Sequence, residues 1–455
     1  MLFQTINPTD GSPLASYPGM DAAAVTAIIE RAAAAQPSWQ DTPFAERARC
    51  LRAAGAILRQ RAPEFARLMA AEMGKPLAQG EAEVRKCATV CDYYAEYGEA
   101  LLAPQAVATE AHRSFVCFRP LGVVLAIMPW NYPYWQVFRF AAPALMAGNA
   151  GLLKHSPNVL GCALSIERIL RDAGFPADLF RTLVIDTDQA AAVIAHPRVR
   201  AVSLTGSVRA GRAVAAQAGA ALKKCVLELG GSDAYVVLED ADLDRAVQAC
   251  ADGRFVNAGQ SCIAAKRFIV VDAVREAFSE RLVARIRRER IGDPLDANTT
   301  IGPLARADLR EQLHAQVRSS VARGARCLLG GELPSGAGWF YPPTLLTDVG
   351  PGMPAYDEEL FGPVACLVGA RDEADAVRIA NDSVFGLGGA VFTRDLARGE
   401  RLATAVIHSG AVFVNQQLVS DPRLPFGGIK DSGYGRELGA FGIREFVNVK
   451  AVSIA

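Results

Sequence analysis

A cysteine and a carboxylate lie in two segments of the chain that glycines mark. Cys262 follows Gly259-Gln260-Ser261, where small and amide residues leave room for a substrate at the sulfur. Glu228 ends the apolar run Cys225-Val226-Leu227 and is followed by Gly230-Gly231. A cysteine and a carboxylate can serve as nucleophile and general base. A cysteine is more often a small buried hydrophobic residue, so this hypothesis depends on the rest of the chain.

The composition bounds the kind of protein that carries these residues. At 455 residues the chain exceeds what one hydrophobic core usually holds, which predicts two or three domains. Lys plus Arg and Asp plus Glu number 48 each, so no charge excess favours nucleic acid or an anionic membrane. The apolar run Leu121–Met128 is far too short to span a bilayer. Without a signal-peptide pattern at the start, we expect a cytoplasmic location.

The cysteines and histidines show no metal-site spacing. Ten cysteines include no Cys-x-x-Cys pair, and five scattered histidines include no His-Glu-x-x-His. A disulfide scaffold is unusual in so long a chain, which indicates a reducing compartment. The sequence therefore predicts no catalytic metal.

Apolar segments alternate with helical patterns in a way that predicts parallel sheets. The rhythm runs from Val123 to Ala216 and restarts after Glu228, without a Gly-x-Gly-x-x-Gly fingerprint. The fold class expected is α/β, with two doubly wound domains: one with a variant dinucleotide-binding sheet and one with Cys262 in an early loop. Strands are predicted at Val123–Met128, Ala150–Lys154, Leu183–Ile185, Val199–Leu204, Tyr235–Leu238 and Arg267–Val271, and a helix at Trp135–Met146.

Helical patterns dominate the chain before the first sheet. Asp21 is the expected N-cap of an alanine-rich helix, and the clearest later pattern runs from Gly80 to Tyr97. These helices carry no recognisable chemistry, so we expect them to serve as scaffold.

Seven short motifs follow one another along the chain: Pro129-Trp130-Asn131-Tyr132-Pro133, Leu153-Lys154, Leu204-Thr205-Gly206-Ser207, Glu228-Leu229-Gly230-Gly231, Gly259-Gln260-Ser261-Cys262, Glu359-Leu360-Phe361-Gly362-Pro363 and Pro425-Phe426-Gly427-Gly428. In this order they resemble the aldehyde dehydrogenase superfamily along nearly the whole chain. Three further stretches, Trp135–Phe140, Lys154–Asn158 and Gly219–Val226, most resemble the short bacterial succinate semialdehyde dehydrogenases.

The resemblance implies catalytic roles for three residues. Cys262 would attack the aldehyde carbon, giving a thiohemiacetal, and the Asn131 side-chain amide with the Cys262 backbone N–H would hold the oxyanion. Hydride transfer to a nicotinamide would leave a thioester, and Glu228 would activate the water that hydrolyses it. Asn131 between two prolines also fits an ordinary turn residue.

The resemblance also implies a nicotinamide cofactor site. Lys154 would bond the adenosine ribose, with Ser156 and Pro157 beside it, and Gly206-Ser207 would cradle phosphates at a helix start. Many NAD-specific relatives have a glutamate where this chain has Pro157, so NAD and NADP both stay open, with a lean to NAD. The nicotinamide end is assigned to Glu359, for its ribose, with Trp130 and Phe361 packing nearby.

Arg139 is the informative residue for the substrate. It lies two helical turns beyond Asn131 among aromatic residues, and a planar guanidinium suits a carboxylate partner. Ser420 would add a hydroxyl, and Phe426 is placed in the same site. Succinate semialdehyde is the expected substrate, oxidised with NAD or NADP. A structural ion pair at a subunit contact for Arg139 and an ordinary loop serine at 420 are the alternatives.

Other functions are weighed against this one. Glutarate semialdehyde or a broad range of aliphatic aldehydes would suit the same chemistry. A dehydrogenase that passes the acyl group to coenzyme A would not need Glu228, and a Cys–His hydrolase needs a histidine near Cys262. A non-catalytic protein on the same fold is hard to reconcile with intact motifs.

The expected domains follow from these patterns. Residues 1–105 and 121–227 are predicted to form the cofactor-binding domain and residues 228–425 the catalytic domain. Residues 106–120 and 426–455 are assigned to a small β oligomerisation arm and the C-terminal strand, as the resemblance implies. The alternating edge strand Phe446–Ile454 also invites pairing with another subunit. A homodimer or homotetramer is expected, with a small aldehyde as the only other partner.

Overall fold

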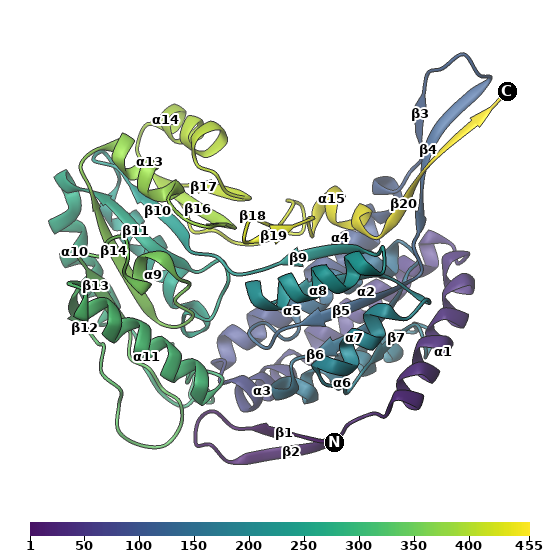
Figure 1. Ribbon diagram of the computed structural model, residues 1–455, viewed down its shortest axis with the longest axis horizontal. Coiled ribbons are helices and arrows are strands. Elements are labelled where there is room, and N and C mark those ends of the chain that lie inside the picture. Colours follow the sequence, from purple (N-terminus) through teal and green to yellow (C-terminus); the bar gives the residue numbers. More distant parts are fainter.

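The computed structural model describes residues 1–455, and each of its two lobes is built on a mainly parallel sheet (Figure 1). The first sheet has six strands in the order β19-β9-β8-β5-β6-β7, and only β19 runs antiparallel. Its strands β5, β6 and β8 are mostly buried, as their largely apolar sequences predict, and Arg200 in β8 is the one exposed residue among them. The strands are β5 (Val123–Met128), β6 (Ala150–His155), β7 (Phe180–Thr182), β8 (Val199–Thr205), β9 (Lys224–Glu228) and β19 (Gly433–Tyr434).

Helices from the first half of the chain pack against this sheet and against one another. Asp21 caps the first of them, as predicted, by accepting from the N–H of Ala24 at 2.8 Å. The long α4 packs against α2, α3 and α5. The helices are α1 (Ala22–Gln40), α2 (Phe44–Gln60), α3 (Ala62–Met73), α4 (Leu77–Leu101), α5 (Trp135–Met146), α6 (Leu160–Asp172), α7 (Thr187–Ala195) and α8 (Val208–Ala220).

The second sheet has seven strands in the order β12-β13-β14-β11-β10-β16-β17 and its own hydrophobic core. Only β12, at one edge, is antiparallel to its neighbour. The strands are β10 (Asp233–Val237), β11 (Ala265–Val271), β12 (Arg326–Leu329), β13 (Thr344–Thr347), β14 (Val364–Ala370), β16 (Gly388–Phe392) and β17 (Ala411–Val414). The helices are α9 (Leu243–Phe255), α10 (Asp272–Ile286), α11 (Ala307–Ala322), α12 (Pro354–Asp357), α13 (Glu373–Asn381) and α14 (Leu396–Arg401).

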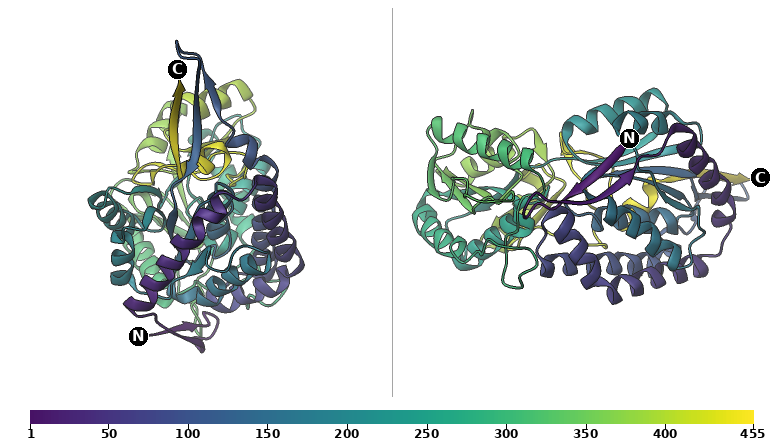
Figure 2. Two further views of the ribbon diagram at one scale, coloured as in Figure 1. Left: turned by 90° about the vertical axis from the view of Figure 1, so that its right-hand side faces the viewer. Right: turned by 90° about the horizontal axis from the view of Figure 1, so that it is seen from below.

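A three-stranded ribbon projects away from both lobes (Figure 2). It consists of β3 (Gln105–Val107), β4 (Arg113–Pro120) and β20 (Val447–Ile454), and β20 is an edge strand. The remaining elements are short: β1 (Leu2–Ile6) and β2 (Pro13–Pro18) form a hairpin, β15 (Phe385–Gly386) pairs with β18 (Ile429–Lys430), and α15 (Gly439–Glu445) precedes β20. Single turns lie at Pro157–Val159, Val256–Gly259 and Leu402–Val406.

The fold class predicted from the sequence is confirmed, with two parallel-sheet α/β domains. The structure differs at residues 426–446, which the sequence assigns to the arm. There β19 joins β9 in the first sheet, and Phe426 and Leu438 belong to the first core. Within residues 426–455, only β20 pairs with the arm strand β4. The other boundaries in the domain division stay predictions.

The strand predicted at Leu183–Ile185 is wrong by three residues. The paired strand is β7, whose residues Phe180–Thr182 lie beside β6. The N–H of Leu183 still donates to the carbonyl of Leu153 in β6 at 2.8 Å. The carbonyl of Val184 accepts instead from the N–H of Met20, just before α1, at 2.9 Å, so the triplet leaves the sheet after Leu183. By contrast, the helix predicted at Trp135–Met146 is confirmed as α5.

None of the helices combines the length and the apolar character that a membrane span requires. The cytoplasmic location stays a prediction.

Candidate active site

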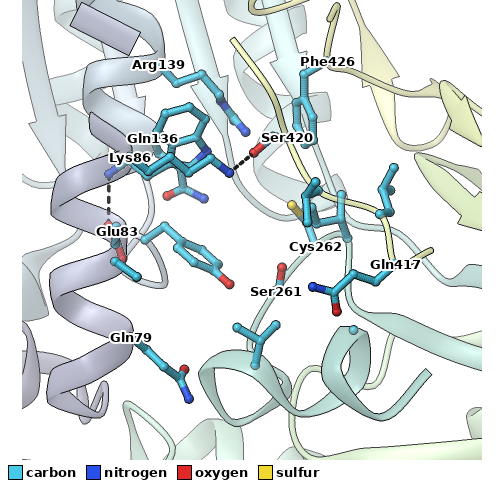
Figure 3. A pocket seen from close by; sticks show the side chains of 18 of the residues that line it. Gln79, Glu83, Lys86, Gln136, Arg139, Ser261, Cys262, Gln417, Ser420 and Phe426 are labelled. Carbon is cyan, nitrogen blue, oxygen red and sulfur yellow. Dashed lines mark hydrogen bonds between the residues drawn. The ribbon is translucent and has the colours of Figure 1, made fainter. Parts of the chain in front are cut away.

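A cavity of about 250 Å³ lies between α4, α5 and the loop that carries Cys262 (Figure 3). Four of the residues assigned from the sequence line it: Cys262, Arg139, Ser420 and Phe426. Asn131 and Glu228 do not line it; both are buried beside it. The other lining residues include Lys75, Gln79, Glu83 and Lys86 from α4 and the turn before it, Tyr132, Trp135 and Gln136 from around α5, and Ser261, Ile263, Gln417, Leu418 and Val419 opposite.

The loop before Cys262 has a tightly constrained backbone. Asn257, Ala258 and Gly259 have φ angles of 56°, 53° and 72°, all in the left-handed region. A Cβ on Gly259 would lie 2.2 Å from the carbonyl oxygen of Gly362, so the position requires glycine. The buried guanidinium of Arg254 donates to the Gly259 carbonyl at 2.8 Å. The strain in this loop is therefore held by surrounding residues.

Lys266 fixes the peptide groups on both sides of Cys262. Its ammonium group donates to the carbonyls of Ser261 at 3.0 Å and Cys262 at 2.7 Å. Because a trans peptide holds N–H and C=O on opposite sides, the N–H of Cys262 points away from Lys266. That N–H donates to no protein atom, so it is free to stabilise an oxyanion.

The Cys262 thiol is half-buried, and burial raises its pKa to about 11. The positive charges of Arg139 and Lys266 lower this pKa, and Glu359 and Asp233 raise it, but burial is the largest effect. At neutral pH the sulfur is therefore mainly a thiol, and its attack on a substrate requires a base.

The side-chain amide of Asn131 has a fixed orientation. Its Oδ1 accepts from Gln136 Nε2 at 3.0 Å, and its Nδ2 donates to the carbonyl of Gln260 at 3.0 Å. The amide nitrogen therefore faces the cysteine loop and keeps one N–H free. The backbone carbonyl of Asn131 accepts from Lys75 Nζ and Asn257 Nδ2, each at 2.8 Å. This arrangement suits the oxyanion role that the resemblance implies.

The Lys75 side chain that contacts Asn131 belongs to a buried ion pair. Lys75 pairs with Glu83, and both side chains are at most 2% exposed. Glu83 Oε1 accepts from the N–H groups of Tyr134 at 2.9 Å and Trp135 at 3.0 Å, at the start of α5. A carboxylate at a helix N-terminus satisfies free N–H groups and opposes the helix dipole. The loop with Asn131 is thus fastened to both α4 and α5.

Glu228 ends β9 and is buried without a hydrogen-bond partner on either carboxylate oxygen. Burial, and next the negative charge of Glu437, hold its pKa well above the usual range, while Arg139 opposes the shift. A Cβ on Gly427 would lie 2.6 Å from Glu228 Oε1, so a glycine there gives the carboxyl group room. Arg139 lines the same cavity as Cys262, and it donates to Thr205, which pairs with Glu228 across β8 and β9. One guanidinium therefore lies near both groups.

Arg139 is not free in the cavity wall. It forms an ion pair with Glu437, and its Nη2 donates to Thr205 Oγ1 at 3.3 Å. Its guanidinium lies over the ring of Phe426, 4.5 Å from the centroid. The ion pair weighed as an alternative therefore exists, but inside this chain. Its role as the substrate anchor stays a prediction.

The predicted cofactor residues gather at one edge of the first sheet. Trp130 follows β5, Lys154 is near the end of β6, and Gly206 and Ser207 follow β8. These strands are parallel, so their carboxyl ends share an edge, where α/β proteins bind nucleotides. Ser207 is the N-cap of α8, and a Cβ on Gly206 would meet nothing closer than 3.8 Å. Open space before a helix N-terminus fits a phosphate group.

The residues at the predicted nicotinamide end lie between the two lobes. The rings of Trp130 and Phe361 meet edge to face, with centroids 5.7 Å apart. Glu359 pairs with Lys266 at 3.3 Å and accepts from the N–H of Gly231 at 3.1 Å. Glu359 therefore connects the cysteine loop to the turn after Glu228. The predicted cofactor residues at the sheet edge and between the lobes fit a dinucleotide. Each contact assigned to them stays a prediction.

Sequence reasoning missed the contribution of α4. The helices before Tyr97 were expected to carry no chemistry, yet α4 lines the cavity with Gln79, Glu83 and Lys86. These positions lie three or four residues apart and share one helix face. Polar residues at helical spacing along an otherwise apolar face are the signal that could have indicated them. Glu437 and Lys266, inside or near recognised motifs, were missed as well.

The comparisons with known proteins identify the family. The profile of the aldehyde dehydrogenase family matches residues 1–452. The chain is 50% identical, over 100% of both chains, to a probable succinate-semialdehyde dehydrogenase [NADP(+)] of Synechocystis sp. (strain ATCC 27184 / PCC 6803 / Kazusa). It is 49% identical to the succinate semialdehyde dehydrogenase [NAD(P)+] Sad of Escherichia coli (strain K12), covering 98% of this chain and 97% of that one.

Solved structures agree with this assignment. Succinic semialdehyde dehydrogenase from Streptococcus pyogenes, in complex with NADP+, superposes with a TM-score of 0.97 at 37% identity, over 99% of both chains. A structure of Gox0499 gives a TM-score of 0.98 at 44% identity, over 100% of both chains. The chain belongs to the aldehyde dehydrogenase family.

Proposed function

We propose that this protein oxidises succinate semialdehyde to succinate with a nicotinamide cofactor, NADP in preference to NAD. One observation carries the substrate: the cavity beside Cys262 is lined by three cations, Lys75, Lys86 and Arg139, against one carboxylate, Glu83. An aldehyde with a carboxylate at its far end matches that charge excess. The names of the relatives from Synechocystis and Escherichia coli support the same substrate.

The chain's own residues account for the chemical steps. The Cys262 sulfur, once deprotonated, adds to the aldehyde carbon, and the carbonyl oxygen becomes an oxyanion held by the Cys262 N–H and the Asn131 amide. When bound, the oxidised nicotinamide supplies the acceptor for the hydride that leaves this carbon. The product of that step is a thioester on Cys262. Glu228, in its ionised form, takes a proton from the water that attacks the thioester, and the thiolate leaves.

The lean to NAD is not supported, and the cofactor preference we propose is the reverse. Pro157, at the first position of a short turn, carries no carboxylate that would repel a 2′-phosphate. Lys154 supplies a positive charge nearby, opposed by Asp186. The relatives named above carry NADP(+) or NAD(P)+ in their names, and the Streptococcus pyogenes structure contains NADP+.

Two other reactions are less well supported. A Cys–His hydrolase would need a histidine at the cavity, and no histidine lines it. An enzyme that transfers the acyl group to coenzyme A would not need the buried, unpartnered carboxyl group of Glu228.

The test is initial-rate kinetics without coenzyme A, using succinate semialdehyde, glutarate semialdehyde and propanal, each with NAD and with NADP. We expect the highest kcat/KM for succinate semialdehyde with NADP. Equal values for the three aldehydes would refute the substrate assignment and leave the dehydrogenase reaction intact. A requirement for coenzyme A would refute the hydrolytic second step.

We further propose that the protein is a homo-oligomer that assembles through β20. This strand is mostly exposed, and its outer edge pairs with no other strand of the chain. Sedimentation of the wild type beside a Val449→Pro variant tests this. We expect the variant to sediment as a smaller species, and an unchanged sedimentation coefficient would refute the role of the β20 edge.

A further inference from the structure

The three cations that line the cavity differ in how their charges are balanced. Lys75 pairs with Glu83, and Arg139 pairs with Glu437. Lys86 has no carboxylate within 4.0 Å of its ammonium group. The charge excess of the cavity is therefore located at Lys86.

Lys86 is held in position by neutral groups. Its Nζ donates to Ser420 Oγ at 2.6 Å and lies over the ring of Trp135, 4.3 Å from the centroid. Figure 3 shows Lys86 and Arg139 pointing into the same part of the cavity, with Ser420 and Phe426 facing them. A partly buried cation without a counter-ion is costly, so the site favours a ligand that brings a negative charge.

We propose that Lys86, together with Ser420, binds the terminal carboxylate of the aldehyde substrate and is the residue that selects an anionic over a neutral aldehyde. This inference rests on the proposed function and goes beyond it, because the sequence placed that role on Arg139. The charge of Arg139 is already balanced by Glu437, and its guanidinium packs against the ring of Phe426.

The hydrogen-bonding capacity of the pair fits a carboxylate. The Ser420 oxygen accepts from Lys86, which leaves the hydroxyl hydrogen free to donate. An ammonium group has three donors, and one is used by Ser420. Two charge-assisted bonds from Lys86 and one bond from Ser420 can therefore reach the two carboxylate oxygens.

The pH dependence of binding offers a second readout. Burial, and next the positive charge of Arg139, lower the pKa of Lys86 to about 8, while Cys87, Glu83 and Asp421 act in the opposite direction. A lysine with a lowered pKa is charged below that pH and neutral above it. The KM for an anionic aldehyde should therefore rise as the pH increases through about 8, and the KM for a neutral aldehyde should not.

The experiment compares Lys86→Met with the wild type on succinate semialdehyde and on butanal. We expect the KM for succinate semialdehyde to rise about 10- to 100-fold, the range for losing a hydrogen bond to a charged group, with the KM for butanal changed less than about twofold. Lys86→Arg should restore much of the selectivity. Arg85→Gln is the matched control, because Arg85 is the neighbouring cation on α4 but is 61% exposed and paired with Glu81.

The outcomes separate this inference from the proposed function. If the wild type itself shows no preference for succinate semialdehyde over butanal, the proposed function fails. If the wild type has the preference and Lys86→Met keeps it, the inference is overturned and the function stands. Equal increases in both KM values would also overturn it, since Lys86 would then only shape the cavity. Should Lys86→Met not fold, Ser420→Ala and the pH dependence of the wild-type KM test the same inference. An unchanged KM for succinate semialdehyde in Ser420→Ala, together with a wild-type KM that does not rise through about pH 8, would overturn it.

Discussion

The guanidinium of Arg139 and the carboxylate of Glu437 form an ion pair that is almost wholly enclosed, with side-chain exposures of 2% and 4%. The pair joins α5 to the segment that follows Phe426, and it lies close to Glu228. Its two charges therefore influence both the stability of the site and the protonation of the carboxyl group beside it.

Removing one partner of this pair should cost more than removing both. We expect Glu437→Gln and Arg139→Met each to lower stability by about 3–5 kcal/mol, because each leaves a buried charge unpaired. The double variant should be more stable than the sum of the single losses predicts. Thermal midpoints of the four proteins at one concentration measure this, and strictly additive losses would show that the two charges do not interact.

Glu228→Gln should separate the two halves of the reaction. Hydride transfer precedes the step that needs a base, so a rapid burst of reduced cofactor should survive while steady-state turnover falls by about 10²–10⁴-fold. Stopped-flow absorbance measures both phases. A lost burst would mean that Glu228 acts before hydride transfer, for example on the Cys262 thiol.

The carboxyl group of Glu228 also determines whether kcat rises or falls with pH. Its pKa is raised by burial and by Glu437, and a general base acts only when ionised. The wild-type kcat should therefore rise with pH, and in Glu228→Gln this rise should disappear.

Cys262 should react as a thiol with a high pKa. With a pKa of about 11, the thiolate fraction rises tenfold per pH unit below that value. The rate of inactivation of the cofactor-free protein by iodoacetamide should therefore rise about tenfold per unit between pH 7 and 9. The measurement uses the Cys327→Ser variant, so that the one exposed cysteine does not react with iodoacetamide. A rate independent of pH above 7 would reveal a preformed thiolate.

Asn131→Ala should lower kcat/KM by about 10²–10³-fold, the cost of removing one oxyanion donor. Lys75→Met should reduce it less, because the Asn131 side chain keeps its bonds to Gln136 and Gln260 when the carbonyl contact is lost. Circular dichroism confirms folding in both cases. Equal losses would indicate that Lys75 acts on the reaction directly.

Pro157→Glu should move the cofactor preference toward NAD. A carboxylate at this exposed position would repel a 2′-phosphate and accept from ribose hydroxyls, lowering the ratio of kcat/KM for NADP over NAD at least about tenfold. Pro157→Gln controls for the loss of proline. If both variants shift the ratio equally, the backbone and not the charge is responsible.

The sequence predicted best where one local pattern decides the structure. The all-apolar segment Val123–Met128 can only be a buried strand, and the helix Trp135–Met146 begins and ends as predicted. The glycine at 259 marks a turn, and its φ of 72° is one that glycine adopts readily. Such features depend on a few neighbouring residues.

The predictions failed where distant segments meet. Nothing around Arg139 indicates that Glu437 neutralises it, and nothing in the helical pattern at Lys86 indicates that Ser420 and Trp135 surround it. Both findings depend on the burial of charges, which is a property of the packed lobes and not of the local sequence.

The pairing of β19 with β9 has a consequence for how the protein is made. Ser432 donates to the carbonyl of Gly230, a residue 202 positions earlier in the chain. During synthesis the edge of β9 beside Glu228 therefore stays open until these later residues have left the ribosome, at roughly 5–20 residues per second. Such non-local pairing slows folding and leaves an unpaired strand edge exposed to association with other nascent chains. Glu228, the proposed general base, lies beside the last part of the first sheet to be completed. The yield of active enzyme should therefore depend on chaperones and on growth temperature.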